Sequence, residues 1–238
     1  DRLLFILPFL AIVPYLYSTG ESSTDYWWLI IAVPLIFFAT IAITGQVWNG
    51  DEFWVNRLKE GGILGLGALS VSLSASIWLI YDYLDHHGHL ESGDPFSWLT
   101  FDVLTYDSEG WSIASSGFSG IGLGIYLDAV SIMLLFVATF LCFLICWFAI
   151  GYMTTDPIND NSNHRFFAEF VLFSMGMFGM VLADNFLWLF IFWEIMGLCS
   201  YLLIGFYYWK KSAAYAAKKA FLTTRVGDVF LMIGLLML

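Results

Sequence analysis

The feature that most constrains the fold of this chain is a series of seven apolar runs separated by polar connections. A transmembrane helix needs about 20 apolar residues to cross ~30 Å of hydrocarbon, and most of the runs reach that length. Charged residues make up only 12% of the chain, which is about half of what a soluble domain carries. We therefore expect an all-α, polytopic membrane helix bundle. The expected helices are residues 3–17, 28–47, 62–83, 122–150, 166–182, 186–208 and 220–238.

The run at residues 3–17 is short and contains two prolines. It can be read as the apolar region of a signal peptide, but only Arg2 supplies positive charge before it and no clear cleavage site follows. A transmembrane helix is the favoured interpretation. The chain starts with Asp1 and stops within an apolar run, so we expect a piece of a longer protein. This piece would form a single membrane domain, with residues 1–27 as an extra N-terminal helix before residues 28–238.

Basic residues are segregated among the connections. With seven helices, one side of the membrane holds no Lys or Arg in its connections, and the N-terminus and the other side hold eight of the 9 basic residues. The positive-inside rule assigns that basic side to the cytoplasm. We expect a cytoplasmic N-terminus and the lipid bilayer as surroundings, with no nucleic acid as partner. The eight residues are Arg2, Arg57, Lys59, Arg165, Lys210, Lys211, Lys218 and Lys219.

The longest polar connection, residues 85–121, lies on the opposite side and is acidic. Residues 98–106 are rich in β-branched and aromatic side chains, residues 107–110 have the composition of a turn, and residues 111–114 can return as a second strand. We expect a short β-hairpin on the membrane surface.

Three groups of residues suggest a metal or phosphate site, but each has a better explanation. Cys142 and Cys146 lie four residues apart in one run and Cys199 lies in another, so apolar packing is favoured over metal binding. The three histidines of residues 86–89 are more typical of a polar loop than of a metal site. The glycines of residues 61–67 follow no strand, which favours close helix packing over a phosphate loop. We expect no metal or cofactor site in this chain.

Glu194 is near the middle of the run at residues 186–208. A charge at that depth costs at least ~2.5–3.5 kcal/mol, so it indicates a function or a partner. Arg225 and Asp228 share one face of the last helix, and Arg225 is expected to approach Glu194 across the helix interface. Burial favours the protonated carboxyl group and a nearby cation favours the ionised one, so a movable cation makes Glu194 a switchable proton site. The alternative is a permanent ion pair that fixes the packing of the two helices.

Two segments resemble a known family. Residues 192–208, FWEIMGLCSYLLIGFYY, and residues 219–230, KAFLTTRVGDVF, are similar to chain L (chain 5) of the proton-pumping NADH:quinone oxidoreductase, respiratory complex I. Weaker similarity occurs at residues 126–131 and 151–153. The resemblance covers roughly residues 28–238.

The resemblance implies that Glu194 is the family's essential glutamate in a half-channel for protons, with Arg225 and Asp228 tuning its proton affinity. Lys218 and Lys219 would line the cytoplasmic mouth of this half-channel. The implied location is a prokaryotic cell (inner) membrane, and the implied partners are the other membrane-arm subunits of complex I. NADH, flavin, iron–sulfur clusters and quinone would belong to those partners, so no redox chemistry is expected in this chain.

Other functions stay open at this point. One is a cation/proton antiporter subunit or the membrane arm of a hydrogenase, although the TRVGD run is typical of the complex I chain. Another is a non-conducting assembly scaffold in which Glu194 is permanently paired. The electron donor, and coupling to sodium rather than protons, cannot be read from these residues.

Overall fold

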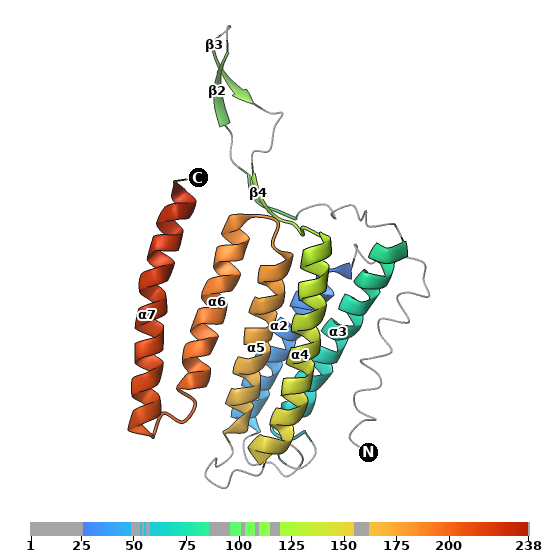
Figure 1. Ribbon diagram of the computed structural model, residues 1–238, viewed down its shortest axis with the longest axis vertical. Helices are drawn as coiled ribbons and strands as arrows, with labels where there is room; N and C mark the ends of the chain where they lie inside the picture. The colour runs from blue at the N-terminus through green and yellow to red at the C-terminus, as the bar shows by residue number, and fades with distance from the viewer. Residues whose placement is uncertain are drawn as a thin grey trace.

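The computed structural model describes residues 26–48, 53, 55, 58–85, 96–100, 103–107, 110–114, 120–154 and 162–237. Within them the chain forms six helices that run side by side in a bundle (Figure 1). The expected helix at residues 3–17 lies outside the described residues. The helices are α2 (Leu29–Val47), α3 (Gly62–Asp85), α4 (Ala129–Thr154), α5 (Asn163–Leu182), α6 (Phe186–Ile204) and α7 (Lys211–Leu236).

Five of the described helices, α2 to α6, are long and apolar enough to cross a membrane. α7 is not among them, and its 26 residues include several charged side chains among the apolar ones. The expected bundle of membrane helices is thus confirmed for five members. A sixth crossing by α7 and a seventh by residues 3–17 stay predictions.

The structure corrects two helix boundaries. The run at residues 122–150 was expected to be helical from its start, but α4 begins only at Ala129, where Asp128 Oδ1 accepts a hydrogen bond from the Ala129 N–H at 2.7 Å. α7 begins at Lys211 rather than at residue 220. Residues 211–220 are rich in alanine and lysine, which favour a helix without making an apolar run.

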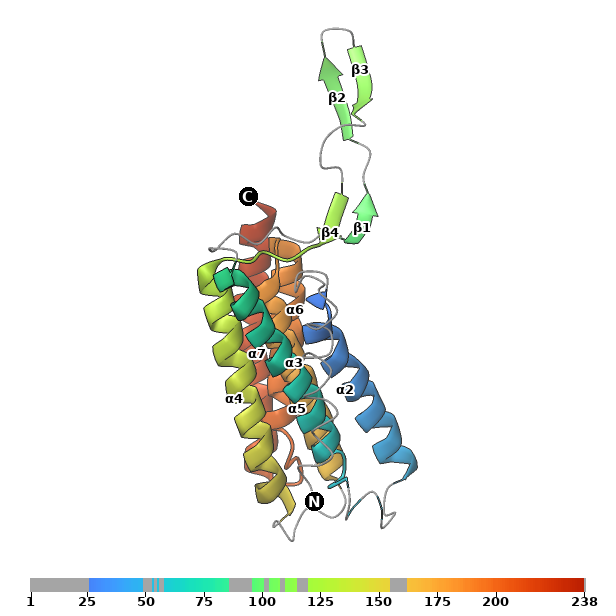
Figure 2. The ribbon, with the colours of Figure 1, turned by 90° about the vertical axis from the view of Figure 1, so that its right-hand side faces the viewer.

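Four strands lie at the end of the bundle where α3 and α5 finish (Figure 2). β1 (Phe96–Thr100) pairs antiparallel with β4 (Gly120–Leu123), and β2 (Val103–Asp107) pairs antiparallel with β3 (Gly110–Ala114). Asp107 is opposite Gly110, at the position where the sequence predicts a turn. The segment at residues 98–106, expected to be one strand, is divided between β1 and β2, which have different partners.

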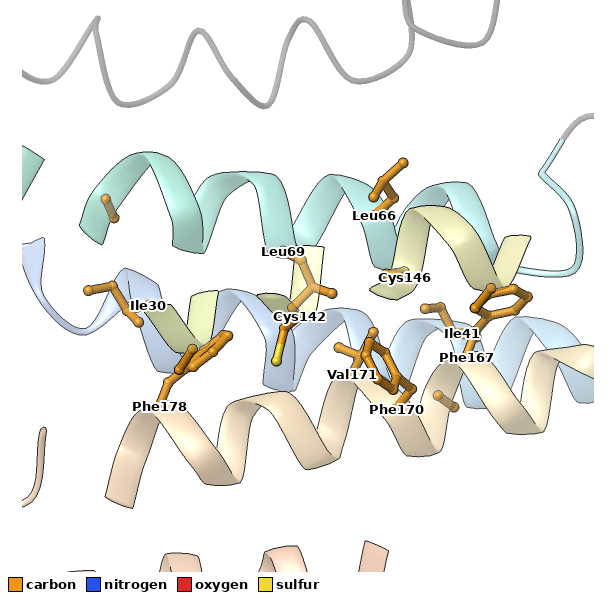
Figure 3. Close-up of a cluster of buried hydrophobic side chains, with 14 of the residues drawn as sticks. Ile30, Ile41, Leu66, Leu69, Cys142, Cys146, Phe167, Phe170, Val171 and Phe178 are labelled. Atoms are coloured by element: carbon orange, nitrogen blue, oxygen red, sulfur yellow. The ribbon is translucent and has the colours of Figure 1, made fainter. Parts of the chain in front are cut away.

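α5 is the central helix of the bundle, because it packs against α2, α3, α4 and α6. Figure 3 shows the core that these helices share, with Cys142 and Cys146 among its aliphatic and aromatic side chains. All three cysteines are buried free thiols, which confirms their apolar packing. The described residues contain no cluster of His, Cys, Asp or Glu that could hold a metal ion, and the histidines of residues 86–89 lie outside them.

Gly62 and Gly179 permit close approaches between helices. A Cβ on Gly62 would lie 2.9 Å from Ile150 Cγ1, which supports the helix-packing interpretation of residues 61–67. A Cβ on Gly179 would lie 2.5 Å from the ring of Phe192. The contact between α5 and α6 therefore depends on a missing side chain, a feature that the sequence alone did not identify.

The turn before α3 is tied to the start of α5. Lys59 and Glu60 have positive φ angles of 51° and 53°, a conformation that costs roughly 1–2 kcal/mol for a residue with a Cβ. The buried Glu60 carboxylate accepts hydrogen bonds from the backbone N–H of Asn163 at 2.9 Å and from its Nδ2 at 3.2 Å. This carboxylate therefore lies at the N-terminus of α5, where the helix dipole stabilises negative charge.

The alternating directions of the helices bring the described basic residues other than Arg225 toward one end of the bundle. Lys59 precedes α3, Arg165 lies in the first turn of α5, and Lys210 caps α7. All three helices start at the end opposite the strands (Figure 1). The predicted segregation of charge is thus present among the described residues.

Candidate functional site

The candidate site lies where α7 packs against α6 at the edge of the bundle (Figure 1). Glu194 is next to the central residue of α6, and Arg225 and Asp228 follow the middle of α7. Neighbouring residues in both helices are mostly apolar, so the three charged side chains meet at the level of the hydrocarbon core if both helices cross a membrane.

Arg225 joins two carboxylates. Its Nη1 forms an ion pair with Oε2 of Glu194 and lies 3.7 Å from Oδ2 of Asp228. Its Nη2 also donates to the backbone carbonyl of Glu194 at 3.4 Å. The pairing that the sequence predicts between these residues is therefore present, both within α7 and across the interface.

Asp228 has a second partner that sequence reasoning missed. Its Oδ1 accepts a hydrogen bond from Trp193 Nε1 at 2.9 Å, and the residue is 7% exposed. A hydrogen bond from an N–H donor to a carboxylate oxygen is stronger than one between neutral groups. The signal in the sequence was a tryptophan next to Glu194, but an indole in a membrane helix is more often an apolar or interfacial side chain.

Glu194 is less enclosed than Asp228, since its side chain is 27% exposed against 10% for Asp228. Arg225 is its ion-pair partner within the described part of the chain. Glu194 therefore depends on the position of one guanidinium, whereas Asp228 also has the indole of Trp193.

The surroundings of Arg225 leave it room to move. Its Cζ lies 4.7 Å from the ring centroid of Phe221, a cation–π distance, and a Cβ on Gly197 would lie 3.8 Å from its Nη2. The side chain is 28% exposed. The guanidinium thus has aromatic and carboxylate partners within a short distance, and no side chain on Gly197 blocks it.

Two grooves flank the site. The first, called the upper groove, has a volume of about 830 Å³ and includes Asp228 and Trp193 in its wall. Its lining is mainly apolar, with the hydroxyl groups of Ser200, Thr223 and Thr224 as further polar groups. The second, called the lower groove, has a volume of about 400 Å³ and is lined by Arg165, Tyr201, Leu202, Gly205, Tyr208, Ala214, Ala217 and Lys218.

The structure does not bring all five predicted site residues together. Lys218 and Lys219 are exposed, and Lys218 lines the lower groove with Arg165. Lys218 precedes Arg225 by seven residues, which is ~10 Å along a helix. Glu194, Arg225 and Asp228 thus form one cluster, and the two lysines lie nearer the basic end of the bundle.

Two known families match separate parts of the chain. "NADH-Ubiquinone oxidoreductase (complex I), chain 5 N-terminus" matches residues 111–167, and "NADH:quinone oxidoreductase/Mrp antiporter, TM" matches residues 183–238. NADH-quinone oxidoreductase subunit L of Pseudomonas aeruginosa is 34% identical over 86% of this chain and 29% of its own length. The chain belongs to the chain 5 (subunit L) family of quinone oxidoreductases.

Other similar proteins have different names. F(420)H(2) dehydrogenase subunit L of Methanosarcina mazei is 44% identical over 59% of this chain and 20% of its own length. The chain thus spans less than a third of the length of these curated relatives. In the solved structure of the membrane-bound sulfane sulfur reductase, an archaeal respiratory membrane complex, a chain matches with a TM-score of 0.61 and 20% identity, over 88% of this chain and 36% of its own. That likeness concerns the fold of the helix bundle alone.

Proposed function

We propose that this chain is part of a proton-translocating membrane-arm subunit of a respiratory complex I, and that Glu194 holds the transported proton. The observation that carries the proposal is the single nitrogen, Nη1 of Arg225, that serves both Glu194 and Asp228. A shift of the guanidinium toward Asp228 or Phe221 weakens its hold on Glu194.

The chemistry follows from the cost of an unpaired charge. When Arg225 is close, Glu194 is stabilised as a carboxylate, and when Arg225 moves away, the carboxylate takes up a proton. Asp228 keeps its bond from Trp193 in both positions and so remains an anchor for the guanidinium. The upper groove offers hydroxyl groups near the pair that can order water for proton transfer.

The remaining roles follow from the same proposal. Lys218 and Lys219 would guard the mouth of the half-channel at the basic end, which we place in the cytoplasm of a prokaryotic cell. α7 would be a membrane crossing, and other membrane-arm subunits would cover its exposed apolar side. NADH, flavin, iron–sulfur clusters and quinone would be bound by partner subunits.

A non-conducting scaffold is the second candidate function. The direct ion pair of Glu194 with Arg225 favours it, because a permanently paired carboxylate would fix α7 on α6 without carrying a proton. The same test separates the two functions.

The test is the Glu194→Gln variant of the full-length subunit in its assembled complex. Gln keeps the size and hydrogen bonding of Glu but cannot hold a transferable proton, so we expect assembly to be retained and donor-driven pumping to fall by about tenfold or more. Leu198→Ala, at an exposed position of α6, is the control and should pump normally. Normal pumping by Glu194→Gln would leave the scaffold function as the better explanation.

A further inference from the structure

A second carboxylate–guanidinium pair lies within α5, outside the cluster around Glu194. We propose that Glu169 is a further proton-accepting group, which takes up a proton from water in the lower groove when Arg165 moves away from it. The inference deepens the proposed function and rests on it only for the later passage of this proton to Glu194.

The first argument is the burial of Glu169. The residue is 8% exposed, Oε1 lies 3.5 Å from Nη2 of Arg165, and Oε2 has no hydrogen-bond partner among the described residues. A buried carboxylate with one unsatisfied oxygen is poorly compensated for its lost hydration. A surface pair at i, i+4 would leave both groups in water, whereas here the acid faces the interior.

The second argument is the exposure of Arg165. Its side chain is 45% exposed and lines the lower groove, and its Cζ lies 5.8 Å from the ring centroid of Tyr208. The guanidinium therefore has two sets of partners, the Glu169 carboxylate on one side and the aromatic ring and groove on the other. Arg225 has the same choice between Glu194 and the ring of Phe221.

The neighbouring helices add no competing charge at Glu169. On α5 itself the other titratable groups are His164 and Arg165. Those of α6 are Glu194, Cys199 and Tyr201, of which the Cys199 thiol interacts electrostatically with the carboxylate. α2 has no titratable side chain, and those of α4 are Cys142, Cys146 and Tyr152. α3 has its titratable groups, Tyr81, Asp82, Tyr83 and Asp85, in its last turns, which lie at the far end of the bundle from the start of α5. Among the described residues, Arg165 is thus the cation paired with Glu169.

The packing of α5 against α6 places Glu169 at the height of the lower groove. Antiparallel contacts bring Phe166 beside Phe206 and Gly176 beside Met196. Glu169 lies between these levels, about two and a half helical turns or ~13 Å from Glu194 along the axis. A proton therefore passes between the two acids through water rather than by direct contact.

The proton transfer involves no change of oxidation state. When Arg165 swings toward Tyr208, an oxygen of Glu169 forms an O–H bond with a proton delivered by water in the lower groove. When Arg165 returns, the guanidinium favours the carboxylate and the O–H bond breaks, which releases the proton to water on the side of Glu194. Arg165 keeps its charge throughout.

The experiment compares Glu169→Gln, Arg165→Gln and the double variant in the full-length complex, reconstituted in vesicles. We expect Glu169→Gln to assemble, to pump several-fold more slowly and to change the pH dependence of pumping. The double variant should be equally slow. A purely structural pair predicts the opposite, because removing both partners together leaves no stranded charge and restores pumping. Restored pumping in the double variant, or an unchanged pH profile in Glu169→Gln, would overturn the proposal.

Infrared difference spectra supply a readout that does not depend on pumping. A carboxylic acid band that exchanges in heavy water should disappear in Glu169→Gln and persist in the control Glu60→Gln, whose carboxylate is fully hydrogen-bonded to Asn163. If the band is unchanged in Glu169→Gln, the protonation of Glu169 is contradicted. This conclusion holds even if Glu194→Gln stops pumping, which would support the proposed function alone. If Glu194→Gln pumps normally while the band is lost in Glu169→Gln, the proposed function fails and the protonation of Glu169 stands.

Discussion

Replacing Arg225 with Ala removes the cation that Glu194 and Asp228 share. Asp228 has a side chain only 10% exposed, and loss of one partner from a buried pair costs about 3–5 kcal/mol. Asp228 retains the bond from Trp193 at 2.9 Å, and Glu194 is less enclosed, with a side chain that is 27% exposed. We therefore expect the free energy of unfolding to fall by ~2–4 kcal/mol, at the lower side of the range for buried pairs.

The measurement is equilibrium denaturation of the detergent-solubilised complex, with the yield of assembled complex as a second readout. Arg225→Ala combined with Asp228→Ala should be milder than the sum of the single losses by ~1–3 kcal/mol, because the second change removes a charge stranded by the first. Val226→Ala, at a position 61% exposed on the same helix, should change stability little. Strict additivity of the two losses would refute the pairing as an energetic unit.

Two further predictions concern topology and packing. Cysteine introduced at Ser92 should react with an impermeant reagent applied from outside, and cysteine at Ser162 should be protected; equal labelling would contradict the seven-span arrangement. Gly179→Ala places a Cβ 2.5 Å from the ring of Phe192 and should lower the thermal midpoint of the complex, at a cost of ~1–3 kcal/mol. Gly151→Ala, with no atom within 4 Å of the added Cβ, is the control, and equal midpoints for both variants would show that the helices adjust.

The positions of the membrane helices were largely predictable, because hydrocarbon demands long apolar runs. The starts of α4 and α7 were predicted wrongly because an apolar run and a helix do not begin at the same residue there. Residues 122–128 are apolar and glycine-rich but precede α4, and residues 211–220 are polar but helical. Hydropathy alone cannot distinguish an apolar strand or turn from the start of a helix.

At the candidate site, the sequence likewise predicted some side-chain contacts and missed others. The spacing of Arg225 and Asp228 predicted their pairing, and the isolation of Glu194 predicted a partner, both of which the structure bears out. Glu169 was missed because Arg165 at i−4 resembles an ordinary surface pair, and only the packing of α5 in the bundle shows that the acid is buried. Which face of a helix is covered depends on its neighbours, and one sequence does not specify them.

The hydrogen bonds from Asn163 to Glu60 also impose an order on biosynthesis. The two residues are 103 positions apart, and at typical elongation rates the ribosome needs about 5–20 s to add that many residues. During this interval α3 and α4 enter the membrane while the Glu60 carboxylate has not yet met the N-terminus of α5. The strained turn at Lys59 and Glu60 therefore gains its hydrogen bonds from Asn163 only when α5 arrives, which makes cotranslational insertion of this helix the step that stabilises the turn.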